Sequence, residues 1–141
     1  MPTLLRQPAR LLLITAALVA SAAHIPVTGP HLEEAPYMGV LFGLLIAACT
    51  LLAIAAALTD RPEIPALSAL VCGAAIVGYA ATRLVAFPQL ADDVGNWLEP
   101  LGIVSVLSEA VVVASALRLL AEHRASKTSR LRAPVVQEMT S

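Results

Sequence analysis

The sequence has few charged residues, and this shortage excludes an ordinary soluble domain. Charged residues make up 13% of the 141 residues, whereas hydrophobic residues make up 58% and the mean hydropathy is +0.81. A soluble domain carries about 25% charged residues, so this surface is too apolar for water. Lipid is the expected surrounding. The net charge of −1 gives no support for nucleic acid as a partner.

Patterns for catalysis and for cofactor binding are also missing. The chain has no nucleophile elbow, P-loop, HExxH motif or dinucleotide fingerprint. One Trp, two Tyr and two Phe are too few for an aromatic cofactor cage. Cys49 and Cys72 lie inside apolar runs without CxxC spacing, which is typical of small buried hydrophobes rather than of a zinc site or a disulfide framework. The sequence therefore identifies no cofactor.

The chain does contain four long apolar runs, over residues 8–25, 37–58, 64–87 and 98–120. At a rise of ~1.5 Å per residue the last three reach about 33–36 Å, enough to cross a hydrocarbon core of ~30 Å, while the first reaches only about 27 Å. We predict an all-α fold, a four-transmembrane-helix antiparallel bundle over residues 1–121. Residues 122–141 are predicted to form a mobile, basic tail.

The first apolar run has a second interpretation. Arg6 and Arg10 precede it, and residues 20–22 (ASA) resemble a signal-peptidase site. Cleavage there would leave three helices and an external N-terminus. The run continues past this site to Ile25, however, and three helices would leave the helix at 37–58 without its antiparallel partner. These two features favour four helices.

Basic residues predict the orientation of the bundle. Eight of the nine precede the first helix, lie between the second and third, or end and follow the fourth: Arg6, Arg10, Arg61, Arg118, Arg124, Lys127, Arg130 and Arg132. The positive-inside rule places these segments, and so both termini, in the cytoplasm. One lysine against eight arginines, in a chain rich in Ala, Leu and Val, suggests a GC-rich genome. We expect a multi-pass protein of a bacterial cytoplasmic membrane.

A glycine pair predicts one close helix crossing. Gly39 and Gly43 form a GxxxG motif at the start of the second helix, and such pairs let two helix backbones approach in lipid. The crossing helix could belong to the same chain, to a membrane-protein partner or to a second copy in a homo-oligomer.

Glu109 is the most informative single residue, because it lies near the bilayer midplane. An ionised group there costs ~2.5–3.5 kcal/mol on insertion scales, and burial favours the protonated acid. Glu109 is then either a neutral group hydrogen-bonded across the bundle or a functional one. Helical spacing puts Glu99, Ser105 and Glu109 on one stripe, opposite Tyr79 and Arg83 of the third helix. These five residues are the predicted binding site, in the outer half of the membrane.

Depth decides the expected partner of Arg83. It lies roughly 6 Å below the outer end of its helix, whereas Glu109 lies about 16 Å below. Because long basic side chains extend toward the interface, we expect Arg83 to pair with Glu99, Asp92 or Asp93.

The outer rim offers a candidate metal site. His24, His31, Glu33 and Glu34 gather there, and imidazole suits copper, zinc or iron. The spacing His-x6-His matches no known ligand signature. The alternative is that the acids favour helix ends and the histidines are polar residues of the interface.

Two segments of the sequence carry a family resemblance. Residues 31–42 (HLEEAPYMGVLF) and 92–102 (DDVGNWLEPLG) resemble small four-helix integral membrane proteins of GC-rich actinobacteria. The resemblance implies a fold and a membrane location for residues 10–121, and no activity.

Three functions follow, in decreasing order of support. The first is a non-enzymatic accessory or binding component of a larger cell-envelope assembly. The second is a metal- or small-molecule-handling protein that uses His24, His31, Arg83, Glu99 and Glu109. The third is a membrane-embedded enzyme.

Overall fold

Four long helices make up most of the computed structural model, which describes the backbone of residues 7–138 and the side chains of residues 7–129. They are α1 (Pro8–Glu34), α2 (Pro36–Leu58), α3 (Glu63–Leu84) and α4 (Pro100–Glu138), with a short 3-10 helix η2 (Ala91–Asp93) between the last two. All four are long and apolar enough to cross a membrane. The predicted all-α, four-helix transmembrane fold is confirmed.

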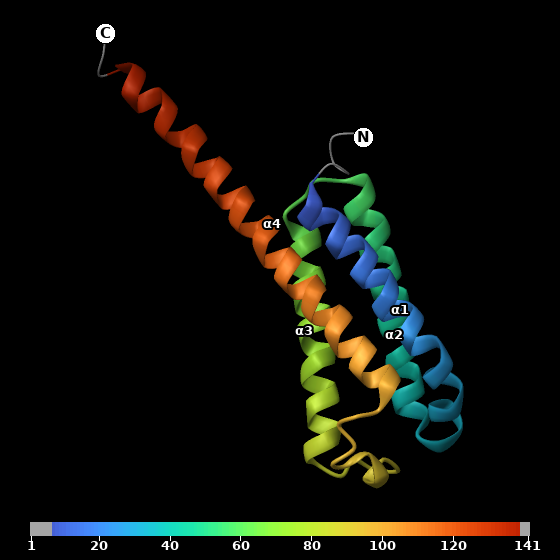
Figure 1. The fold of residues 1–141 in the computed structure, drawn as a ribbon. Coiled ribbons are helices and arrows are strands. Elements are labelled where there is room, and N and C mark those ends of the chain that lie inside the picture. Colours follow the sequence, from blue (N-terminus) through green and yellow to red (C-terminus); the bar gives the residue numbers. More distant parts are fainter. Residues whose placement is uncertain (1–6, 139–141) are drawn as a thin grey trace.

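The helices form two unequal sides joined by α4 (Figure 1). The hairpin of α1 and α2 forms one side and α3 forms the other, while α4 crosses diagonally and packs against both α1 and α3. Contacts between α2 and α3 are few. The start of α1 and the far end of α4 lie on the same side as the α2–α3 turn, and the loop of residues 85–99 lies on the opposite side. We call these the Arg10 end and the Arg83 end, after the buried arginine in each.

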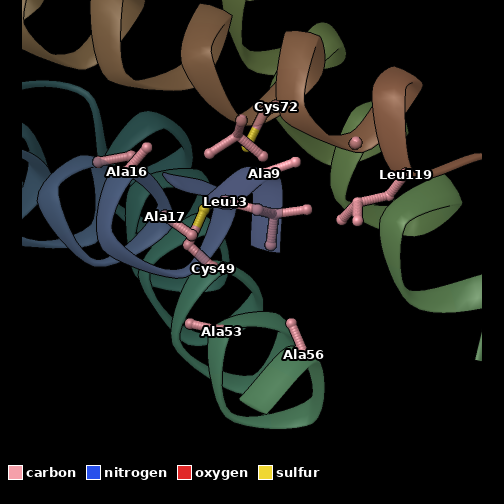
Figure 2. Close-up of a cluster of buried hydrophobic side chains, with 12 residues drawn as sticks. Ala9, Leu13, Ala16, Ala17, Cys49, Ala53, Ala56, Cys72 and Leu119 are labelled. Atoms are coloured by element: carbon pink, nitrogen blue, oxygen red, sulfur yellow. The ribbon is translucent and has the colours of Figure 1, made fainter. Parts of the chain in front are cut away.

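The packed core lies toward the Arg10 end. It consists mainly of alanines and other small residues from α1, α2 and α4, with one cysteine from α3 (Figure 2). Small side chains let helix backbones approach closely in lipid. Helix α1 supplies five of the twelve core residues, namely Ala9, Leu13, Ala16, Ala17 and Ala20. The bundle described here therefore depends on α1, including the ASA segment that resembles a cleavage site.

Two helix ends lie far beyond the predicted ones, and α3 ends at Leu84, three residues before the predicted end at Phe87. Helix α1 continues beyond Ile25, through Pro26 and Pro30, to Glu34. Prolines are tolerated in membrane helices where other groups satisfy the freed backbone carbonyls or the local backbone adjusts.

At the other end of the chain, α4 continues past the predicted end at Leu120 to Glu138. The residues after Leu120 include Ala, Glu, Arg and Lys, which favour helix. The polar tail expected from residue 122 onward is thus helical as far as the structure describes it, and residues 139–141 lie outside the described part.

Gly39 permits a close crossing within the chain. A Cβ atom at Gly39 would lie 2.6 Å from Cγ of Leu32 and 2.7 Å from the backbone N of Leu32. Nothing lies within 4 Å of the corresponding position at Gly43. The first glycine of the motif therefore serves the contact between α1 and α2, and the second faces open space.

Candidate binding site at the Arg83 end

A cavity of about 790 Å³ lies among the four helices at the Arg83 end. Most of its wall is apolar, contributed by α2 and α3. The structure brings all five residues of the predicted binding site to this cavity: Tyr79, Arg83, Glu99, Ser105 and Glu109. Residues selected by helical spacing on two separate helices thus share one hollow.

Arg83 organises the polar rim of the cavity. Its side chain is 5% exposed, with Nη1 2.9 Å from Oδ1 of Asp93 and Nη2 3.2 Å from Oε2 of Glu99. The guanidinium carbon lies 4.6 Å from the centre of the Tyr79 ring, a cation–π geometry. The expectation that Arg83 pairs with acids near the end of its helix is confirmed for Asp93 and Glu99.

The loop of residues 85–99 is fastened to the same arginine. The backbone N–H of Gly95 donates to the carbonyl of Arg83 at 2.9 Å, and Gly95 has a positive φ of 80°, which glycine adopts without strain. The hydroxyl of Tyr79 donates to the carbonyl of Trp97 at 3.0 Å. Side-chain and backbone contacts together hold this loop beside the cavity.

Gly102 lets α4 approach the ring of Tyr79. A Cβ atom at Gly102 would lie 2.6 Å from Cε2 of Tyr79 and 3.1 Å from Oε2 of Glu99. A larger residue would have to displace the ring that supports Arg83. The absence of a side chain at Gly102 therefore allows the Tyr79 ring to lie against α4 and contact Arg83.

Glu109 lies deeper in the cavity than Arg83, beside His24 of α1. It is 1% exposed, and its Oε1 atom lies 3.9 Å from Nε2 of His24. This distance is longer than a hydrogen bond. Among residues 7–129, Glu109 Oε1 and Arg83 Nε are the buried side-chain polar atoms without a hydrogen-bond partner.

The sequence grouped His24 with Glu109 as residues of the second function but did not predict their direct approach. A first helix ending at Ile25 puts His24 on the outer rim. Because α1 continues to Glu34, His24 instead lies within the helix, against Glu109. The continuation of α1 was not predicted because proline usually ends or bends a helix, and two prolines follow Ile25.

The predicted metal site is not assembled in the described residues. His24 and His31 both line the cavity and flank the ring of Phe42, at centroid distances of 5.1 and 5.0 Å. Glu33 and Glu34 are exposed and lie outside the cavity lining. No group of three or more His, Cys, Asp or Glu side chains that could hold a metal ion exists in this part of the chain.

The Arg10 end holds a second polar cluster, with a different character. Nη1 of Arg10 donates to the carbonyls of Ala56 and Thr59 at 2.9 and 2.6 Å, and Nη2 pairs with Asp60. Nε2 of His123 lies 3.2 Å from Oδ1 of Asp60. Arg10 thus caps the C-terminus of α2, where cations are favourable, and Asp60 links α1, α2 and α4.

Comparison of the chain with protein-family models, with curated proteins and with solved structures found no match. The chemistry of the cavity is therefore the basis for a functional conclusion.

Proposed function

We propose that the protein is a non-enzymatic membrane protein that binds a small amphipathic molecule in the cavity at the Arg83 end. The single observation that carries this proposal is the cavity itself. Its volume of about 790 Å³ falls in the range of roughly 300–1,000 Å³ typical of small-molecule sites. Such sites combine apolar walls with a few placed polar groups, and this combination is present here.

The sparse contact between α2 and α3 supports entry from the bilayer. Both helices line the cavity, and lining residues such as Leu41 and Leu44 of α2 are more than half exposed. A molecule dissolved in the lipid could therefore enter between these two helices. Its apolar body would lie against α2 and α3, with its polar group near Arg83 and Glu109.

The arginine distribution supports a bacterial cytoplasmic membrane with the Arg10 end inside the cell. A green fluorescent protein fused to the C-terminus is then expected to fluoresce, and alkaline phosphatase fused there is expected to be inactive. The reverse pattern would contradict this orientation.

A matched pair of adjacent residues tests the cavity. Ala48 lines it, whereas the neighbouring Ala47 is exposed and does not. We expect wild-type protein purified in mild detergent to carry a small molecule detectable by mass spectrometry of the intact complex. Ala48→Trp places a large side chain in the cavity and should abolish binding of the small molecule, while Ala47→Trp should retain it. Equal retention in both folded variants would contradict the proposal.

An accessory role in a larger envelope assembly stays a prediction. The same preparation tests it, because a stoichiometric protein partner would co-purify from native membranes. Recovery of the chain alone, with its small molecule bound, would favour an independent binding protein.

A further inference from the structure

We propose that the deep polar end of the cavity binds a primary ammonium group carried on an apolar body, with Glu109 and His24 as the groups that contact it. This inference rests on the proposed function and adds the chemistry of the bound head group.

The charges around the cavity favour a cation. Both Nη atoms of Arg83 are taken by carboxylates, Asp93 on one side and Glu99 on the other. Glu109 adds a third acid to the same cavity. A carboxylate or phosphate head group would therefore meet a surplus of acids, whereas a cation would offset it.

Glu109 is the acid that lacks a partner. Its Oε1 atom is buried in the cavity wall without a hydrogen bond to residues 7–129, and a buried polar atom left unpaired is costly. The basic side chain within 4.0 Å of it in this part of the chain is His24. A cationic donor that enters the cavity would satisfy this oxygen and stabilise the ionised form of the acid.

The hydrogen bond of His24 defines what its ring presents to Glu109. Nδ1 lies 2.8 Å from the carbonyl oxygen of Ala20. A carbonyl only accepts, so Nδ1 carries the hydrogen and the neutral ring presents a lone pair at Nε2. His24 is buried, and burial in an apolar wall favours this neutral ring over an imidazolium. Nε2 and Oε1 are then two acceptors 3.9 Å apart.

One nitrogen can bridge these two acceptors. Two acceptors at this separation can both lie about 2.8–3.0 Å from one nitrogen atom, once the side chains open to admit it. A primary ammonium has three N–H donors, enough for both acceptors, and its charge compensates Glu109. A hydroxyl has a single donor and no charge, and a quaternary ammonium has charge and no donor. A primary ammonium therefore suits this pair of acceptors better than a hydroxyl or a quaternary ammonium does.

Four probes with the same alkyl chain separate charge from donor capacity: dodecylamine, dodecanol, dodecyltrimethylammonium and dodecanoate. Binding is measured to the full chain in nanodiscs, with Ala48→Trp protein in the same lipid as the reference for partitioning into the bilayer. We expect dodecylamine to bind at least about tenfold tighter than each of the others, because charge-assisted hydrogen bonds distinguish it.

Two variants of the contacting residues test the assignment. Glu109→Gln keeps the shape and removes the charge, and should reduce the preference for dodecylamine to within about threefold. His24→Phe keeps an aromatic ring against Phe42 and removes the acceptor, and should reduce the preference in part. Glu63→Gln, an exposed acid at the Arg10 end, is the control and should leave it unchanged. If Glu109→Gln fails to fold, Glu109→Asp keeps the charge and should keep a weakened preference.

The outcomes separate this inference from the proposed function. Equal affinity for all four probes, lowered together by Ala48→Trp, would overturn the ammonium assignment and leave the cavity as a binding site. A full preference for the amine in Glu109→Gln would also overturn the assignment. If no probe distinguishes wild-type protein from Ala48→Trp, both proposals are wrong.

Discussion

The two ends of the bundle each bury an arginine, and they use it differently. Arg10 is 3% exposed and Arg83 is 5% exposed. The partners of Arg10 are carbonyls at the end of α2 and the side chain of Asp60. The partners of Arg83 come from the loop of residues 85–99 and border a cavity. Arginine thus caps the C-terminus of α2 at one end of the bundle and lines the cavity at the other.

The difference lies in which polar atoms remain unpaired. In residues 7–129, the buried side-chain polar atoms without a hydrogen bond are both at the Arg83 end, on Arg83 and Glu109. The alanine-rich core is packed toward the Arg10 end. A fully paired cluster beside a dense core stabilises the fold. Unpaired polar atoms in a cavity can form favourable hydrogen bonds with a bound molecule. We therefore assign a structural role to the Arg10 end and a binding role to the Arg83 end.

The largest loss of stability is expected from a substitution at the Arg10 end. Arg10→Met removes two hydrogen bonds to helix carbonyls and the pair with Asp60, and should lower the free energy of unfolding by about 2–4 kcal/mol. Unfolding in mixed detergent with increasing sodium dodecyl sulfate measures it. Arg61→Met is the matched control, because Arg61 is exposed beside Asp60, and should change stability by less than about 0.5 kcal/mol. Similar losses in both variants would refute a structural role for Arg10.

The next effect concerns the crossing of α1 and α2. Gly39→Ala forces a methyl group against the backbone of Leu32, and overpacking of this kind costs about 1–3 kcal/mol. Gly43→Ala, four residues along the same motif, meets open space and should be neutral or slightly stabilising, by less than about 1 kcal/mol. The same unfolding assay compares them. A larger loss at Gly43 would show that the motif serves another crossing.

The smallest effect has the opposite sign and lies at the Arg83 end. Glu109→Leu removes a buried, unpaired oxygen, so the protein without ligand should gain about 1–2 kcal/mol in its free energy of unfolding. Glu63→Gln should leave stability within about 0.5 kcal/mol of wild type. A clear loss of stability in Glu109→Leu would mean that Glu109 is a structural group, as Arg10 is, and would remove the contrast between the two ends.

Hydrophobic run length was sufficient to predict the helices, because lipid imposes a long apolar stretch on each span. It could not predict where α1 and α4 end. The continuation of α1 passes through Pro26 and Pro30, and proline usually ends or bends a helix. The continuation of α4 beyond Leu120 involves polar residues that carry no membrane signal.

Four of the five predicted site residues lie on stripes of α3 and α4, where spacing is a local property, and Glu99 directly precedes α4. Contacts between residues that lie far apart in the sequence could not be predicted in this way. His24 approaches Glu109 across 85 positions of sequence, and Arg10 approaches Asp60 across 50. Such contacts depend on how the helices pack, which a single sequence does not reveal.

The length of α4 has a mechanical consequence. This one helix contains Glu109 within the cavity and extends to Glu138, well beyond the bundle (Figure 1). At ~1.5 Å per residue the two positions lie about 43 Å apart along the axis. A straight rod of that length that tilts by roughly 5° moves its far end by about 4 Å. Any tilt of α4 about the cavity is therefore amplified into a displacement at the far end of the helix.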